Sequence, residues 1–237
     1  MYDIQKIRSD FPILSRQVNG KPLTYLDNGA SAQKPQVVID AVTRAYAEEY
    51  ANVAYGWAMP HLQAGDEIIL SVMEHHANIV PWHFLRERQG VVLKWIDIEA
   101  DGSFDEQKLI DAIGPKTKLI AITQMSNVLG TRVDVKSICT AARAKGVRVL
   151  VDGSQAAVHG PVNVRDLECD FYAITGHKLY GPSASGAIYI HPDRQAEMAP
   201  FIGGGDMIRE VHKDTVLYND PPMKFEAGTP GIVQTIG

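Results

Sequence analysis

The sequence predicts an α/β fold, with a mainly parallel β-sheet and helices on both of its faces. Short runs rich in Val, Ile and Leu alternate with segments of helical periodicity, which is typical of strand–helix–strand units with right-handed crossovers. The runs are continuously apolar, as strands covered on both faces require. The expected strands are residues 67–72, 91–98, 118–125, 147–153, 169–176 and 186–191.

Segments with an apolar stripe of helical period lie before and between these strands. Pro35 suits the first turn of the first helix. The second is expected to end at Gly90, and Gly146 is placed just beyond the last turn of the fourth. The segment from Gly203 onward is rich in Gly and Pro and is expected to be irregular. The expected helices are residues 35–50, 77–89, 104–113 and 135–146.

Composition and charge are those of an ordinary globular protein, with 45% apolar and 22% charged residues. The net charge of −5 offers no basic face to a nucleic-acid partner. The apolar runs are too short to span a bilayer, and residues 1–11 lack the apolar core of a signal peptide. Cys139 and Cys169 lie far apart, which argues against a disulfide scaffold or a zinc site and suits a reducing cytoplasm.

Polar side chains follow four of the expected strands. Ligands of open α/β sheets bind outside the carboxyl ends of the strands, so these side chains are candidates for one shared site. They are Glu74, His75 and His76 after the first strand, Ser126 and Asn127 after the third, Asp152, Ser154 and Gln155 at the end of the fourth, and Thr175, His177 and Lys178 at the end of the fifth.

Three of these residues suit pyridoxal 5′-phosphate (PLP). The cofactor needs a lysine amine that bonds to its aldehyde, and Lys178 can supply it. It needs a carboxylate beside its pyridine nitrogen, which keeps the ring electron-withdrawing, and Asp152 fits this place. Gln155 can donate a hydrogen bond to the phenolate oxygen. The sequence therefore predicts a covalently attached PLP at the carboxyl edge of the sheet.

Three further residues complete the expected site. His75 can stack on the face of the cofactor ring. Thr175 and His177 flank the lysine and can donate to the phosphate.

Each candidate has a simpler explanation when it is taken alone. Asp152 can cap a helix or close a turn, and Asn127 can be a turn residue. His75 and His76 can be a surface pair, and Lys178 can be a solvated lysine. The coincidence of such residues at four strand ends favours the cofactor site.

A nucleotide and a metal ion are weaker alternative ligands. The glycines at 203–205 do not open a helix after the first strand, as a dinucleotide fingerprint requires. A metal site on His75, His76 and His177 is disfavoured because adjacent residues of an extended segment point to opposite sides.

Five segments resemble one enzyme family over almost the whole chain. The longest, residues 151–182, is similar to the cofactor-lysine region of the fold-type I PLP enzymes of the class V aminotransferase group. More narrowly, it resembles the Suf-type (group II) cysteine desulfurases and the related selenocysteine lyases. The other segments are DFPILSRQVNGKPLTYLDNGASAQKPQVVIDA, MEHHANIVPW, ITQMSNVLGT and FEAGTP.

The resemblance implies the large, cofactor-binding domain of such an enzyme and gives the strand-end residues the roles named above. Lys178 and His75 are then the catalytic residues, and Lys178 also moves protons at the substrate Cα. Asn127 would bind the substrate carboxylate or lie against the cofactor. Thr229 would reach the phosphate of the partner subunit's cofactor, which implies a homodimer.

The resemblance also implies a reaction. L-cysteine becomes L-alanine, and its sulfur passes as a persulfide on an enzyme cysteine to an acceptor protein of iron–sulfur cluster assembly. A selenocysteine lyase or another class V enzyme, and a catalytically incomplete PLP-binding protein, are the alternatives.

The sequence departs from the family pattern in two regions. A few dozen residues with a glycine/threonine phosphate-binding turn are expected to be missing near residues 53–54, and the small C-terminal domain with the persulfide cysteine and a substrate-binding arginine is expected to be absent after Gly237. Cys139 and Cys169 are expected to be core thiols. The expected division is an N-terminal arm, residues 1–30, and a PLP-binding domain, residues 31–237.

Overall fold

The computed structural model describes residues 3–23, 52–182, 185–228, 231 and 236, and the chain forms two compact units, residues 1–49 and 50–237. In the first unit, the Asp3 carboxylate caps a short helix by accepting from the backbone N–H groups of Gln5 and Lys6. Its elements are α1 (Ile4–Ser9), η1 (Pro12–Ser15) and an antiparallel pair, β1 (Gln17–Val18) and β2 (Lys21–Pro22). The helix expected at residues 35–50 lies outside the described residues.

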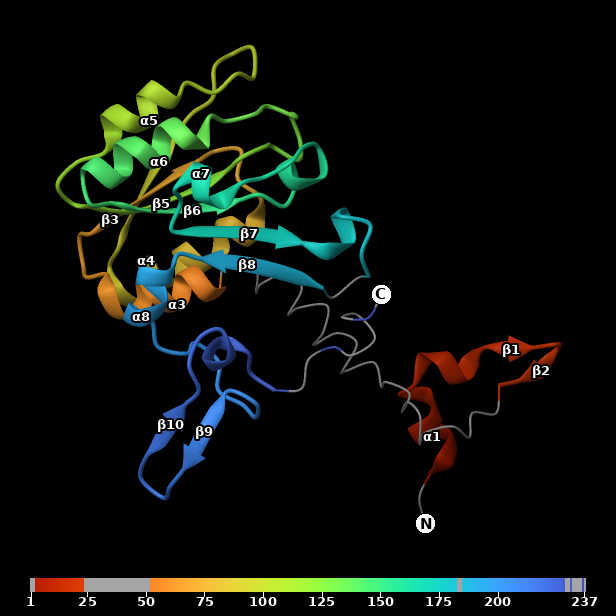
Figure 1. The fold of residues 1–237 in the computed structure, drawn as a ribbon. Coiled ribbons are helices and arrows are strands. Elements are labelled where there is room, and N and C mark those ends of the chain that lie inside the picture. Colours follow the sequence, from red (N-terminus) through yellow and green to blue (C-terminus); the bar gives the residue numbers. More distant parts are fainter. Residues whose placement is uncertain (1–2, 24–51, 183–184, 229–230, 232–235, 237) are drawn as a thin grey trace. The chain divides into compact units, whose positions relative to one another are not determined.

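A six-stranded sheet forms the centre of the second unit (Figure 1). The strand order is β4-β3-β5-β6-β7-β8; β8 is antiparallel to β7, and the other neighbours are parallel. The strands are β3 (Glu67–Ser71), β4 (Val92–Ile96), β5 (Thr117–Thr123), β6 (Arg148–Asp152), β7 (Phe171–Thr175) and β8 (Gly186–Ile190). The predicted α/β fold with a mainly parallel sheet is thus confirmed.

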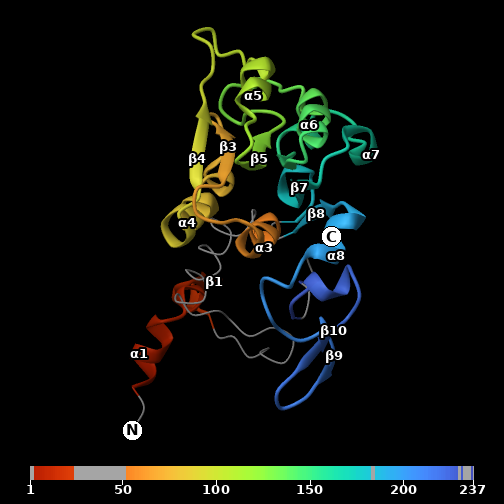
Figure 2. The same cartoon turned by 90° about the vertical axis from the view of Figure 1, so that its left-hand side faces the viewer.

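Helices cover both faces of this sheet (Figures 1 and 2). In β5, Ile120 and Ile122 pack into one apolar cluster with α5, α6 and α7, whereas Leu119 and Ala121 pack into another with α3 and α4. The continuous apolar run of β5 therefore does mark a strand that is buried on both sides. The helices are α3 (Asn52–His61), α4 (Val80–Gln89), α5 (Glu106–Ala112), α6 (Val135–Ala144), α7 (Val164–Leu167) and α8 (Pro192–Glu197).

The ends of the helices follow local chemistry. Gly90 and Gly146 have φ angles of 73° and 71°, so both expected terminal glycines adopt the left-handed conformation. The second helix starts later than expected: a 3₁₀ turn, η2 (His76–Asn78), precedes α4. Pro81 lies in the first turn of α4, where its missing N–H has no consequence.

Two sequence-based expectations were wrong. The strand at residues 91–98 was expected to be covered on both faces, but β4 is an edge strand with Val92 and Trp95 exposed. The segment after Gly203 was expected to be irregular, but it contains an antiparallel pair of strands, β9 (Ile208–Val211) and β10 (Val216–Tyr218). In the turn between them, the His212 N–H donates to the carbonyl oxygen of Thr215. Within the described part of the chain, no helix is both long and apolar enough to cross a membrane.

Gly153 is required by a close contact at the end of β6. A Cβ atom at this position would lie 2.1 Å from the ring of Tyr172, which is buried and donates its hydroxyl to Gln124 Oε1 at 2.6 Å. We expect Gly153→Ala to lower the free energy of unfolding by about 1–3 kcal/mol in urea denaturation, as overpacking usually does. Gly160→Ala is the control, because a methyl group added there would meet nothing within 4 Å. Equal stabilities of the two variants would contradict the argument.

Candidate functional site

The strand order creates a switch point between β3 and β5. These strands are neighbours, although β4 lies between them in the sequence. The connection after β3 leads to α4 on one face of the sheet, and the connection after β5 leads to α6 on the other face. Chain segments diverge here at the carboxyl edge, which is where open α/β sheets bind ligands.

Residues from four parallel strands meet this edge. His75 follows β3, Asn127 follows β5, and Asp152 is the last residue of β6. Thr175 is the last residue of β7, and Lys178 ends the 3₁₀ turn η4 (Gly176–Lys178) that follows it.

Asp152 and Lys178 both lie close enough to His75 to act on its imidazole electrostatically. Burial lowers the pKa of His75, Asp152 acts to raise it, and Lys178 and His76 lower it further. The imidazole is therefore neutral near pH 7. Its Nδ1 accepts the backbone N–H of Ala77 at 3.2 Å, so the proton of the neutral ring is on Nε2.

The other predicted site residues have partners of their own. The Oδ1 atom of Asp152 accepts the backbone N–H of Ser154 at 2.9 Å. Thr175 Oγ1 lies 3.0 Å from His177 Nδ1, so these two neighbours of the lysine are brought together. Gln155 Nε2 lies 3.2 Å from His159 Nε2, a contact that the sequence analysis did not anticipate.

Two further residues were predicted for the site, Asn127 and Thr229. Asn127 is exposed in the turn after β5. Thr229 lies outside the described residues.

Glu74 is a residue at this edge to which the sequence analysis gave no role. Its side chain is buried and accepts from Ser71 Oγ at 2.5 Å and from Asn78 Nδ2 at 2.7 Å. Burial raises its pKa to about 7 against the lowering effect of these hydrogen bonds and of the Thr123 backbone, and Asp152 raises it further. The spacing of Ser71, Glu74 and Asn78, three and four residues apart beside a buried strand, was the available signal.

The two cysteines of the chain do not belong to the site. Cys139 lies on the buried side of α6, and Cys169 is buried immediately before β7. Burial raises the pKa of both thiols far above neutral pH. Neither is a thiolate nucleophile at pH 7, in agreement with their expected core positions.

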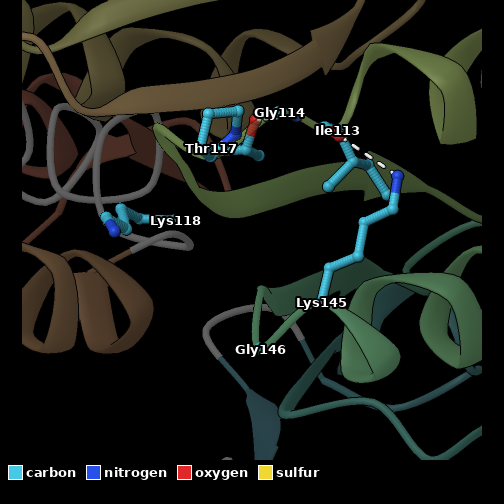
Figure 3. Close-up of a pocket in the computed structure, with 7 residues that line it drawn as sticks. Ile113, Gly114, Thr117, Lys118, Lys145 and Gly146 are labelled. Atoms are coloured by element: carbon cyan, nitrogen blue, oxygen red, sulfur yellow. Dashed lines mark hydrogen bonds between the residues drawn. The ribbon is translucent and has the colours of Figure 1, made fainter.

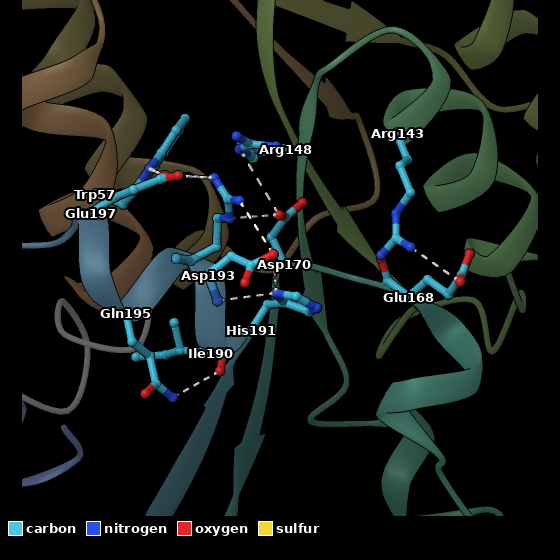
Figure 4. Close-up of polar contacts among 11 residues, drawn as sticks. Trp57, Arg143, Arg148, Glu168, Asp170, Ile190, His191, Asp193, Gln195 and Glu197 are labelled. Carbon is cyan, nitrogen blue, oxygen red and sulfur yellow. Dashed lines mark hydrogen bonds and ion pairs between the residues drawn. The ribbon is translucent and has the colours of Figure 1, made fainter.

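Polar groups at the opposite edge of the sheet have structural roles. A pocket of about 260 Å³ lies beside the start of β5, and its Lys145 donates to the carbonyl oxygens of Ile110 and Ile113 (Figure 3). Near the start of β7, the buried Arg194 of α8 forms ion pairs with Asp170 and Glu197. Figure 4 labels these two acidic residues. Lys145 thus joins the end of α6 to the end of α5, and Arg194 joins α8 to the amino end of β7, away from the carboxyl edge.

Comparisons with known proteins agree with this arrangement. The family described as Aminotransferase class-V matches residues 53–237. The "Probable cysteine desulfurase" of Xylella fastidiosa (strain Temecula1 / ATCC 700964) is 43% identical over 281 residues, which cover 99% of this chain and 68% of the relative. Because that aligned region is longer than this chain of 237 residues, the relative carries more than 40 residues that face a gap here.

Solved structures are similar as well. The crystal structure of the cysteine desulfurase CsdA from Escherichia coli matches with a TM-score of 0.73 and 31% identity, over 100% of this chain and 70% of that one. A variant of C-DES with glycine covalently linked to its PLP cofactor matches with a TM-score of 0.69 and 28% identity, over 84% of this chain and 57% of that one. The sheet, the carboxyl-edge residues and these similarities together show that the chain belongs to the class V aminotransferase family.

Proposed function

We propose that this chain is the cofactor-binding part of a PLP-dependent cysteine desulfurase, which converts L-cysteine to L-alanine and passes the sulfur on. One observation carries the proposal: His75, Asp152 and Lys178 come from three different strand ends at the carboxyl edge, where Asp152 and Lys178 both act electrostatically on His75. The names of the relatives support the choice of cysteine as the substrate.

The side chains at this edge fit PLP. Lys178 is half-buried and carries the amine for the covalent link, and Asp152 supplies a half-buried carboxylate for the pyridine nitrogen. The neutral ring of His75 suits stacking, because it brings no charge to the face of the cofactor. Thr175 and His177, already in contact, suit the phosphate. Gln155 suits the phenolate oxygen.

When bound, PLP supplies an electron sink that stabilises negative charge on the substrate Cα. The chain's own residues would do the rest. Lys178 Nζ removes and returns the proton at this carbon, and Asp152 keeps a negative charge beside the ring. His75 presents a neutral Nε2–H donor, because its Nδ1 is held by Ala77. Asn127, from the exposed turn after β5, would bind the substrate carboxylate.

The thiolate that takes up the sulfur must come from outside the described site, because both cysteines of this chain are buried with raised pKa values. We therefore place it on another part of the enzyme, which then passes the persulfide to an acceptor protein for iron–sulfur cluster assembly. The free thiols suit a reducing cytoplasm. A homodimer, in which Thr229 reaches the partner's cofactor, completes the proposal, with residues 1–30 as an arm and 31–237 as the cofactor domain.

Reductive trapping tests the proposal directly. The purified protein is mixed with PLP and reduced with borohydride, and the modified peptide is located by mass spectrometry. We expect a pyridoxyl adduct on Lys178, because this lysine lies at the carboxyl edge, and no adduct on Lys145, whose amine is bound to carbonyl oxygens at the opposite edge.

Product analysis separates the alternatives. Alanine released from L-cysteine supports the desulfurase, whereas release from selenocysteine alone supports a selenocysteine lyase. Bound cofactor without any release supports a PLP-binding protein that lacks catalytic parts. An unmodified Lys178 would overturn the proposed cofactor site.

A further inference from the structure

A buried network of hydrogen bonds lies beside His75. The carboxylate of Glu74 accepts from Ser71 Oγ at 2.5 Å through Oε1 and from Asn78 Nδ2 at 2.7 Å through Oε2. Asn78 Oδ1 in turn accepts the indole N–H of Trp82 at 3.3 Å. One carboxylate thus links the last residue of β3, the turn η2 and, through Asn78, the first turns of α4.

The residues joined by this network enclose the turn that carries His75. The carbonyl oxygen of His75 accepts the N–H of Asn78 at 2.8 Å, and its Nδ1 accepts the N–H of Ala77 at 3.2 Å. The ring is therefore held by the backbone of the turn rather than by a neighbouring element. A backbone change that breaks the Ala77 contact removes the hydrogen bond that selects which ring nitrogen carries the proton.

A carboxyl group is a costly way to fill this space. Glu74 is only 6% exposed, and burying a carboxylate costs free energy that an apolar side chain of similar volume does not incur. The group also lies in the field of Asp152, another carboxylate. Filling the core does not require a polar side chain, whereas joining Ser71 to Asn78 by hydrogen bonds does.

We propose that Glu74 is a positioning residue: its hydrogen bonds from Ser71 and Asn78 fix the turn between β3 and α4, so that His75 keeps its Nδ1 on the Ala77 N–H, its proton on Nε2 and its ring at the carboxyl edge of the sheet. The importance of this positioning for catalysis rests on the proposed function. The tautomer of His75 does not depend on the proposed function, because it is a property of the protein without substrate.

Nitrogen-15 NMR of the histidine rings tests the proposal on the full chain, with His75→Asn used to assign the signals. In the wild-type protein we expect the Nε2–H tautomer and a His75 pKa below that of a free imidazole. In Glu74→Ala we expect loss of the tautomer preference and a rise of the His75 pKa toward its ordinary value. In Glu74→Gln we expect the wild-type tautomer, because the amide oxygen accepts from Asn78 and the Ser71 hydroxyl can turn to accept from the amide nitrogen.

Thr117→Val is the matched control for a general loss of stability. Thr117 is also buried and also hydrogen-bonded, to Glu67 Oε2 at 3.1 Å, but it lies at the other end of the sheet, at the start of β5. We expect this variant to be less stable with an unchanged His75 signal.

An unchanged tautomer and pKa of His75 in folded Glu74→Ala would overturn the proposal. If that variant does not fold, Ser71→Ala replaces it, since it deletes the hydroxyl that donates to Glu74 Oε1 and accepts from the Met73 N–H while leaving the carboxyl group in place. An unchanged His75 in Ser71→Ala then overturns the proposal. Absence of cysteine turnover in the complete enzyme would count against the proposed function and leave this test intact.

Discussion

The Lys178→Ala variant is expected to release alanine from L-cysteine about 10²–10⁴ times more slowly than the wild-type enzyme. The substitution removes the amine that links to the cofactor and moves the Cα proton, and such proton transfers contribute about this factor. The rate is measured as alanine formed under saturating cysteine and PLP in the complete enzyme. Borohydride is expected to fix no cofactor at position 178 of this variant.

Lys145→Ala is the matched control for the loss of a lysine. Its amine donates to the carbonyl oxygens of Ile110 and Ile113 at the edge opposite the site, so its removal is expected to leave turnover unchanged. Wild-type turnover by Lys178→Ala, or a comparable loss in Lys145→Ala, would contradict the assignment of the catalytic lysine.

The second large effect concerns stability and pH. Burial raises the pKa of Glu74 from 4.5 to about 7. Between these values the unfolded state has already lost the proton that the folded state retains, so the free energy of unfolding decreases as the pH rises. Above pH 7 the full cost is reached, about 3 kcal/mol at 1.36 kcal/mol per pKa unit. Glu74→Gln keeps the neutral form at every pH and is expected to lack this decrease.

Urea denaturation of the wild-type protein and of Glu74→Gln at pH 5 and pH 8.5 measures the effect. The change in the free energy of unfolding between the two pH values in the variant is subtracted from the same change in the wild-type protein. The difference cancels other groups that titrate in this range, including His75. Glu87→Gln on α4 is the control, because Glu87 is exposed and its carboxylate stays solvated in the folded state. A Glu74→Gln variant with the same pH dependence as the wild-type protein would contradict the prediction.

The sequence predicted the centre of the fold well, because burial on both faces leaves a strong pattern. The run at 118–125 became β5, Thr117–Thr123, and the run at 147–153 became β6, Arg148–Asp152. The rule that ligands bind at carboxyl strand ends then led to Asp152 and Lys178 without knowledge of the strand order.

Features that depend on tertiary contacts could not be predicted. The apolar run of β8 carries no sign of its direction; it is antiparallel because only ten residues separate it from β7, fewer than a crossover helix needs. The Gly- and Pro-rich composition after Gly203 concealed β9 and β10, which are short and mostly exposed. The role of Glu74 depends on partners that only the folded turn brings together.

The hydrogen bonds that run from Glu74 through Asn78 to Trp82 place a fluorescent side chain next to the site. This indole is fully buried and donates its N–H to Asn78, which is bonded to Glu74. A change in the charge of that carboxyl group, or in the turn it holds, alters the electrostatic environment of a native fluorophore. We therefore expect changes at the carboxyl edge of the sheet to alter the emission of Trp82, one of the three tryptophans of the chain, without any attached dye.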